Sequence, residues 1–415
     1  MNFELQPITE PGVRLVALAE AHAQDFAGRA EQHDRDGSFP FENITALTKS
    51  GVMAACVPQE LGGLGVESVH DYVLGINRLG RGDGATAIAA NMHIFRPWRL
   101  TRAWRAAVAA EQPRQASAAE HLLRRVGAGE LVMAALLSEA GTDLLHPMVG
   151  VTPADGGWLL NGHKIFATMS PAADLFDVAC RVPDGRGGYR RALAMIPRGR
   201  LGMDVKNNWD ALGMRASGSH DVVFTDCFVS EGELVDAGPW GNWGEPFLAG
   251  NLVITMGLVG AFLGIAETAR DLIVGMLKGR RKGPGERALA ERPSIQHTVA
   301  EIEVALATAR AMLERTAMIT DEFFRVRPAG RIPLDELHAL MKDFQCTKLA
   351  VTRKAVDIVD LALTASGGAG YLSKNPLSRL YRDVRAGPFM QPFSPNEAFD
   401  YIGKVALGLD PVLES

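Results

Sequence analysis

The sequence predicts an α+β fold that is mostly helical, with a helical N-terminal domain (residues 1–130), a central antiparallel β-domain (131–238) and a C-terminal four-helix bundle (239–415). In the first and last regions apolar residues recur at i, i+3 and i+4, which indicates helices. The middle region has short alternating runs broken by Gly, Asp, Asn and Pro, which indicates strands. Because helices and strands are segregated along the chain, an alternating α/β fold is excluded.

Individual elements follow from the same patterns. The helices expected in the first domain span residues 13–27, 41–50, 69–79, 85–95 and 116–126, with a glycine-rich turn at 58–65. The strands expected in the middle domain span 132–137, 157–160, 178–181, 191–196 and 220–228. The helices expected in the bundle span 251–278, 294–326, 333–364 and 396–407.

Composition limits the class of protein. The 43 basic and 48 acidic residues give a net charge of −5, so nothing favours a nucleic-acid partner. The start of the chain has no basic segment followed by an apolar run, and we expect a cytoplasmic protein. No metal-type spacing links the cysteines, which we expect to be reduced and buried, and we predict no metal site. These cysteines are Cys56, Cys180, Cys227 and Cys346.

One segment is long and apolar enough to cross a membrane. Residues 247–266 carry no charge, and Gly260 and Gly264 have the small-xxx-small spacing of membrane helix pairs. Asn251 and Thr255 interrupt the run, and no second such segment exists in the sequence. We therefore expect the core helix of a large helical assembly and no membrane partner.

The closing part of the chain carries a family signature. The glycine turn at 366–371 is followed by a Pro-x-x-x-Leu segment that ends in Arg382-Asp383. Together with the turn at 58–65 and the order of the three regions, this resembles the acyl-CoA dehydrogenase family of flavoproteins over nearly the whole chain. The resemblance implies FAD as cofactor and a homo-oligomer, either a dimer or a tetramer.

Two motifs of the middle region resemble the family's flavin-binding segments. The loop Ser138-Glu139-Ala140-Gly141-Thr142 resembles one whose hydroxyl and main-chain groups bond the flavin ring, which implies roles for Ser138, Gly141 and Thr142. The segment 159–168 resembles a strand on which Phe166 packs against the ring and Thr168 approaches its N5 atom.

Further positions come from the same resemblance. Arg281 and Gln296 resemble residues that reach the diphosphate and adenosine of FAD from a neighbouring subunit. The glycines of the closing turn, Gly367, Gly368 and Gly370, resemble a turn that lets the adenine half approach closely. Arg215, in a loop before the last strand, is expected either to bind an anionic group of the substrate or to form a structural ion pair.

The reaction is where the sequence departs from the family. The family's base is a glutamate a few residues beyond the Arg-Asp pair, and Gln391 stands there, beside Met390 as a candidate substrate contact. An amide cannot take a proton at neutral pH. The alternative position for the glutamate falls near Ile254, and the nearest acids are Glu245 and Glu397.

Three functions stay open on the sequence. The first is an FAD-dependent oxidoreductase acting on the CH–CH group of a small or carrier-linked acyl thioester without the usual base. The second is a flavin-dependent monooxygenase that uses reduced flavin from a reductase partner and O2 on a small aromatic, sulfur or amine substrate. Its relatives often place a histidine near the flavin, and His93 is the candidate here. The third is a non-catalytic flavin or acyl-carrier binding protein.

Overall fold

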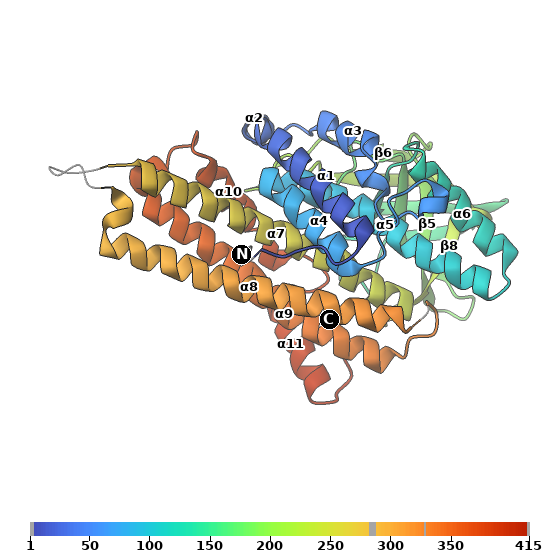
Figure 1. Cartoon of the computed structure of the whole chain (residues 1–415). Coiled ribbons are helices and arrows are strands. Elements are labelled where there is room, and N and C mark those ends of the chain that lie inside the picture. The colour runs from blue at the N-terminus through green and yellow to red at the C-terminus, as the bar shows by residue number, and fades with distance from the viewer. Residues whose placement is uncertain (1–3, 282–287, 328, 413–415) are drawn as a thin grey trace.

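The computed structural model describes residues 4–281, 288–327 and 329–412. Six helices form the N-terminal region, the strands lie together at one end of the molecule, and three long helices extend away from them (Figure 1). The predicted α+β class with its helical, β and helical regions is confirmed. The first six helices are α1 (Glu10–Ala27), α2 (Ala30–Asp36), α3 (Phe41–Lys49), α4 (Val69–Gly82), α5 (Gly84–Ala109) and α6 (Pro113–Gly127).

Helix α5 runs fourteen residues beyond the end that we predicted from its apolar spacing. It continues through Pro97 because tertiary contacts hold its second half. Trp98 is buried against Phe324 at a ring distance of 5.3 Å, and the Thr101 hydroxyl donates to the Cys56 carbonyl at 3.0 Å. Its start is fixed locally, since the Asp83 carboxylate accepts from the amides of the first turn.

The strands form one mixed sheet in the order β6-β7-β3-β2-β4-β5-β8, with β1 paired to β4. Most pairs are antiparallel, as predicted, but β1 lies parallel to β4 with Met133 opposite Leu175, and β2 lies parallel to β4 with Gly150 opposite Arg181. The wholly antiparallel prediction was therefore wrong in this detail, because alternation does not encode which strands become neighbours. The strands are β1 (Met133–Leu136), β2 (Gly150–Ala154), β3 (Gly157–Ala167), β4 (Leu175–Pro183), β5 (Tyr189–Pro197), β6 (Met203–Val205), β7 (His220–Ser230) and β8 (Leu234–Pro239).

The C-terminal region is built on α7, whose apolar window is completely buried, as expected for a core helix. Its glycines are needed for packing: a Cβ on Gly257 would stand 2.0 Å from Asn91 Oδ1, and one on Gly264 would stand 2.2 Å from the Asn77 carbonyl. The small-xxx-small pair, Gly260 and Gly264, thus serves close contact with α4 inside the protein, and Gly257 allows contact with α5. The helices are α7 (Glu245–Gly279), α8 (Pro293–Arg325), α9 (Leu334–Ser366), α10 (Pro376–Val384) and α11 (Pro395–Ala406).

Several elements of the structure were not predicted, namely helices α2 and α10 and strands β2, β6 and β8, and one cysteine differs from its expected burial. Helix α10 was not predicted, because its nine residues are too few for a clear apolar period; the Asn375 side chain caps it and Leu377 and Leu380 bury one face. Three of the four cysteines are buried as expected, but Cys346 on α9 is exposed.

Candidate functional site

A cavity of about 470 Å³ lies where the sheet meets α5, α7 and the segment after α10. Its size falls within the range of about 300–1,000 Å³ that small-molecule sites occupy. Most of its wall is apolar, and several hydroxyls lie along the sheet side. The hydroxyl-bearing lining residues are Ser138, Thr168, Ser217, Ser219 and Thr255.

Phe166 on β3 presents its ring to this cavity. Its backbone has a φ of 54°, an uncommon conformation for a residue with a side chain, and its side chain is 58% exposed. The ring meets Trp209 edge-on at 5.8 Å between centroids. Two residues later, the Thr168 hydroxyl shares a 2.8 Å hydrogen bond with Ser219, which bonds Ser217 at 2.6 Å. The sheet side of the cavity therefore offers an aromatic face beside a hydroxyl cluster.

Ser138 joins this wall through a loop that a buried ion pair fixes. Lys164 on β3 is fully buried, and its Nζ lies 2.6 Å from Glu139 Oε1. The other oxygen of Glu139 accepts from the Met148 and Val149 amides at 2.9 and 3.0 Å. Ile165 donates its amide to the Ser138 carbonyl at 3.0 Å. These contacts hold the loop at the sheet edge and leave Ser138 at the cavity.

The opposite wall is one face of α7. Asn251, Ile254, Thr255 and Leu258 line the cavity at i, i+3, i+4 and i+7, so they share one side of the helix. The Thr255 hydroxyl donates to the main-chain carbonyl of Gln391 at 2.9 Å. This bond places Gln391 at the cavity, next to the alternative base position that Ile254 occupies.

The charged residues in the described lining of the cavity are all basic. In the chain as described, no Asp or Glu lines the cavity, and its charged members are Arg382 and Arg385. Arg382 is paired with Asp34 at 2.5 Å. Neither acidic candidate reaches the site: Glu245 opens α7, and Glu397 caps α11 by accepting from the Ser394 amide at 2.6 Å. No described carboxylate is available as a base.

These features fit a flavin ring. The isoalloxazine is a flat aromatic plate with an apolar edge and a polar edge of carbonyl and nitrogen atoms. The aromatic and aliphatic lining around Phe166 suits the plate, and the hydroxyls of Ser138 and Thr168 suit the polar edge.

Of the predicted site residues, the structure brings five to the cavity. These are Ser138, Phe166, Thr168, Met390 and Gln391. The residues that prediction missed include Trp209, Asn251, Thr255 and Phe389. A signal existed for Asn251 and Thr255, since both are polar in an otherwise apolar helix.

His93 does not line the cavity. It is fully buried, and its Nδ1 accepts from the Met133 amide at 2.9 Å. Burial lowers the pKa of His93 to about 4, so the ring is neutral at physiological pH. The preceding residue on α5, Met92, lines the cavity instead. His93 points away from this lining because adjacent residues of a helix point in different directions, and a role for it near the flavin stays a prediction.

Three further predicted residues lie outside the described lining. A Cβ on Gly141 would have no atom of the described chain within 4 Å, and the Thr142 hydroxyl donates to the His146 carbonyl at 2.6 Å. Arg215 donates to the Asp34 carbonyl at 2.9 Å and pairs with Asp210 at 3.2 Å. For Arg215 the structure supports the structural alternative over a substrate contact.

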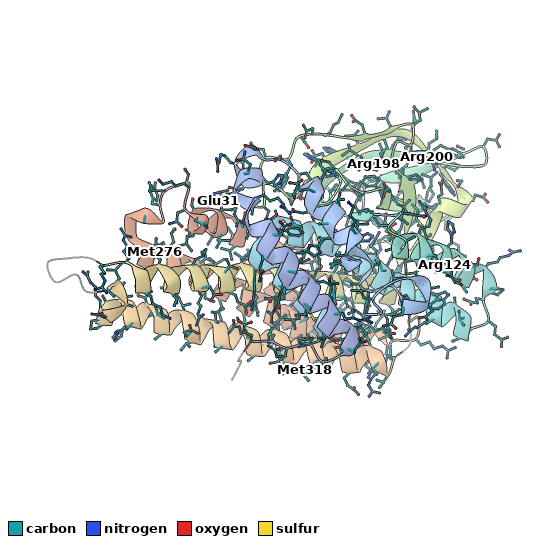
Figure 2. All side chains as sticks on the ribbon, turned by 45° about the horizontal axis from the view of Figure 1, so that its top comes forward. Glu31, Arg124, Arg198, Arg200, Met276 and Met318 are labelled. Atoms are coloured by element: carbon teal, nitrogen blue, oxygen red, sulfur yellow. The ribbon has the colours of Figure 1, made fainter. Side chains whose placement is uncertain are left out.

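The expected adenosine-side residues gather at the far end of the bundle. Arg280 on the end of α7 donates to the Ser366 carbonyl at 3.2 Å, which places Arg281 beside the turn at Gly367, Gly368 and Gly370. Gln296 lies near the start of α8, where it donates to the Ala290 carbonyl at 3.0 Å. Met276 marks this end in Figure 2, and Arg198 and Arg200 mark the distant β-region.

Arg281 lies far from the cavity in its own chain. Helix α7 continues for twenty-one positions from the lining residue Leu258 to its end at Gly279, which corresponds to about 32 Å, and Arg281 follows two residues beyond that end. An arginine side chain cannot bridge that length. The side chain of Arg281 therefore does not reach the cavity of its own chain, and contact with FAD from a neighbouring subunit stays what the resemblance implies.

Comparison with known families agrees with this architecture. The chain matches the acyl-CoA dehydrogenase N-terminal domain over residues 15–98, the middle domain over residues 137–227 and the C-terminal domain over residues 256–393. The protein belongs to the acyl-CoA dehydrogenase family, whose members are flavin-dependent oxidoreductases.

Full-length relatives point to a particular branch. The chain is 35% identical to the amino sugar nitrososynthase DnmZ of Streptomyces peucetius, covering 98% of this chain and 96% of that protein. It is 37% identical to the L-evernosamine nitrososynthase of a Micromonospora strain, covering 97% and 92%. It also resembles the solved structure of KijD3 with FMN and a dTDP-linked amino sugar, with a TM-score of 0.89, 35% identity and coverage of 98% and 96%.

Proposed function

We propose that this protein is a flavin-dependent monooxygenase that oxidises the amino group of a nucleotide-linked amino sugar. The observation that carries the proposal is Gln391, an amide in the family's base position, in a cavity whose described lining has no carboxylate. The full-length similarity to nitrososynthases supports the same reading. Of the two oxidation reactions that the sequence left open, this one needs no carboxylate.

Oxygenation of an amine requires the neutral form, since the nitrogen lone pair attacks the oxygen donor. A carboxylate beside the amine would stabilise its ammonium form and withdraw that lone pair. The Gln391 carboxamide oxygen accepts a hydrogen bond from a neutral amine without adding charge. The positive charge of Arg385 in the lining also disfavours a bound cation, whereas that of Arg382 is compensated by Asp34. The site is thus suited to a free amine.

Oxidation of the amine balances with O2 as the co-reactant and reduced flavin as the reductant. Reduced flavin, when bound, supplies the activation of O2. Each oxygenation inserts one oxygen atom into an N–H bond, reduces the other to water and consumes two electrons and two protons. A first round gives a hydroxylamine and a second gives the nitroso group plus another water. The electrons come from a reductase partner, as expected for the monooxygenase alternative.

The residues of the chain supply binding, orientation and exclusion of water. Met92, Ile254 and Leu258 give the cavity an apolar wall that limits the water available to quench a reactive oxygen donor. Phe166 offers the flavin a stacking face, and Thr168 a hydroxyl at its polar edge. We keep FAD as the expected cofactor, held with the help of a second copy, although one similar structure contains FMN.

Dehydrogenation of an acyl thioester is the second candidate, on the strength of the family. It would need a base that the described lining lacks. One experiment separates the two: the purified protein, loaded with FAD or FMN and supplied with a flavin reductase, is given either a dTDP-linked amino sugar or a series of acyl-CoA thioesters. We expect a hydroxylamine or nitroso product with oxygen from labelled O2. Enoyl thioester formation without such a product would overturn the proposal.

A further inference from the structure

Lys348 on α9 is a buried lysine beneath the loop that carries Gln391. It is 1% exposed, and its Nζ donates to the carbonyls of Met390 and, at 2.5 Å, Phe393. No ion pair with a carboxylate is recorded for it in the described ranges. Burial of an ammonium without such a partner is unfavourable, so packing alone does not account for a lysine here.

The two hydrogen bonds of Lys348 lie on either side of Gln391 in the sequence. Met390 immediately precedes Gln391, and Phe393 follows it by two positions. From the other side, the Thr255 hydroxyl on α7 donates to the carbonyl of Gln391 itself. Three carbonyls of this short loop are therefore held by side chains from two helices, whereas the turn before it, at Gly387–Phe389, is closed by main-chain bonds.

The far side of the loop has anchors of its own. The Phe393 ring is buried, stacks on Tyr401 at 4.5 Å and meets Trp243 edge-on at 5.8 Å. Tyr401 in turn bonds His338 Nδ1 at 2.6 Å. These contacts do not involve Lys348, so its loss should leave Phe393 in place and free the part of the loop nearer the cavity.

We propose that Lys348 is a positioning residue that sets where the Gln391 carboxamide stands in the cavity. It has no place in the described lining itself and acts through the two carbonyls that flank Gln391. We call the two hydrogen bonds from Lys348 Nζ to the Met390 and Phe393 carbonyls the clamp. The clamp does not depend on the charge of Lys348, since a neutral amine still has two N–H groups for two acceptors. Burial lowers the pKa of Lys348 to about 7, with nearby Glu397 opposing the shift.

The consequence for catalysis rests on the proposed function, but the clamp does not. The test uses Lys348→Met, which keeps length and apolar bulk and removes the donors. Lys354→Met, on the same helix and away from the loop, is the matched control. Hydrogen–deuterium exchange over residues 386–394 is expected to rise at least tenfold in Lys348→Met and to stay unchanged in the control. Unchanged exchange in both would overturn the clamp.

A double-mutant cycle separates positioning from general support. With the dTDP-linked amino sugar as substrate, Lys348→Met is expected to raise KM roughly tenfold, as expected for loss of a few hydrogen bonds that order the site. If Lys348 acts through Gln391, then Gln391→Ala will change KM much less in the Lys348→Met protein than in the wild type. Fully additive effects would overturn the positioning role. Absence of turnover in the wild type would count against the proposed function, and exchange would still decide the clamp.

Discussion

The buried carboxylate of Asp383 on α10 accepts a hydrogen bond from the Met214 amide at 2.6 Å, and so ties the bundle to the loop that lines the cavity. Met214 has a φ of 52°, and a Cβ on its neighbour Gly213 would stand 2.3 Å from the Arg382 carbonyl. The Arg-Asp pair of the family signature therefore has a structural role: it fixes the junction between two regions.

This junction predicts a pH dependence of stability. Burial raises the pKa of Asp383 to about 6, above the ordinary value of an aspartate. Its contribution to stability is therefore full below about pH 4 and is lost as the pH rises through about 6. Asp383→Asn keeps an acceptor for Met214 and removes the titration. We expect the variant to gain roughly 1–3 kcal/mol relative to wild type between pH 4.5 and 7.5 in urea unfolding. The exposed Asp155→Asn is the control, and a pH-independent difference would contradict the reading.

Thr255 is predicted to act through its hydroxyl. Thr255→Val removes the donor to the Gln391 carbonyl at nearly constant volume. It should cost about 1 kcal/mol of unfolding free energy and raise KM for the amine substrate, because the carbonyl loses its partner. Thr255→Ser retains the hydroxyl and should stay close to wild type. Equal behaviour of Val and Ser variants would show that the bond does not position the loop.

Phe166 is predicted to bind flavin more than to stabilise the fold. Phe166 is 58% exposed, so Phe166→Ala should change the melting temperature of the flavin-free protein little while weakening flavin binding at least tenfold. Both residues carry a Cβ, so the positive φ is equally strained in each. Phe228→Ala, on neighbouring β7 outside the described lining, is the control. Fluorescence titration measures the flavin affinity of both variants. An equal loss of affinity in Phe228→Ala would refute the assignment of Phe166 as a flavin contact.

Gln391→Glu should move amine oxidation to higher pH. A carboxylate beside the amine raises the pKa of the amine, so more alkaline solution is needed to free its lone pair. At pH 7 turnover should fall about tenfold or more, and the pH–rate profile should shift upward. Gln391→Leu, which adds no charge, should lower the rate without that shift. An unshifted profile in the Glu variant would argue against a neutral amine at this residue.

Arg281 is predicted to distinguish the two flavin nucleotides. It lies two residues beyond the end of α7, about 32 Å of helix past the lining residue Leu258, and on the family resemblance a second copy presents it to the adenosine half of FAD. Arg281→Ala should weaken FAD binding several-fold and leave FMN binding unchanged, since FMN lacks adenosine. Lys278→Ala, nearby on α7, is the control. Equal losses for both nucleotides, measured with the oligomeric state checked by light scattering, would exclude the role.

Much of the fold followed from local patterns. The long helices of the bundle were predicted close to their observed bounds, because apolar spacing is a local property, whereas β3 runs seven residues beyond its predicted end at Leu160. Helix α10 and the second half of α5 were not predicted, since Asn375 capping and Trp98 packing depend on neighbours distant in sequence. Strand partners such as β1 and β4 are also nonlocal.

The sequence by itself determined the family, the segment that brings Phe166 and Thr168 to the cavity, and the presence of Gln391 where the family has a carboxylate. Only the tertiary structure decided that His93 is packed away from the cavity, that Arg215 is engaged by Asp34 and Asp210, and that Thr255 and Lys348 hold the Gln391 loop. The physical reason is that residue type fixes what chemistry a side chain can do, whereas its partners are set by helices and strands that meet from distant parts of the chain.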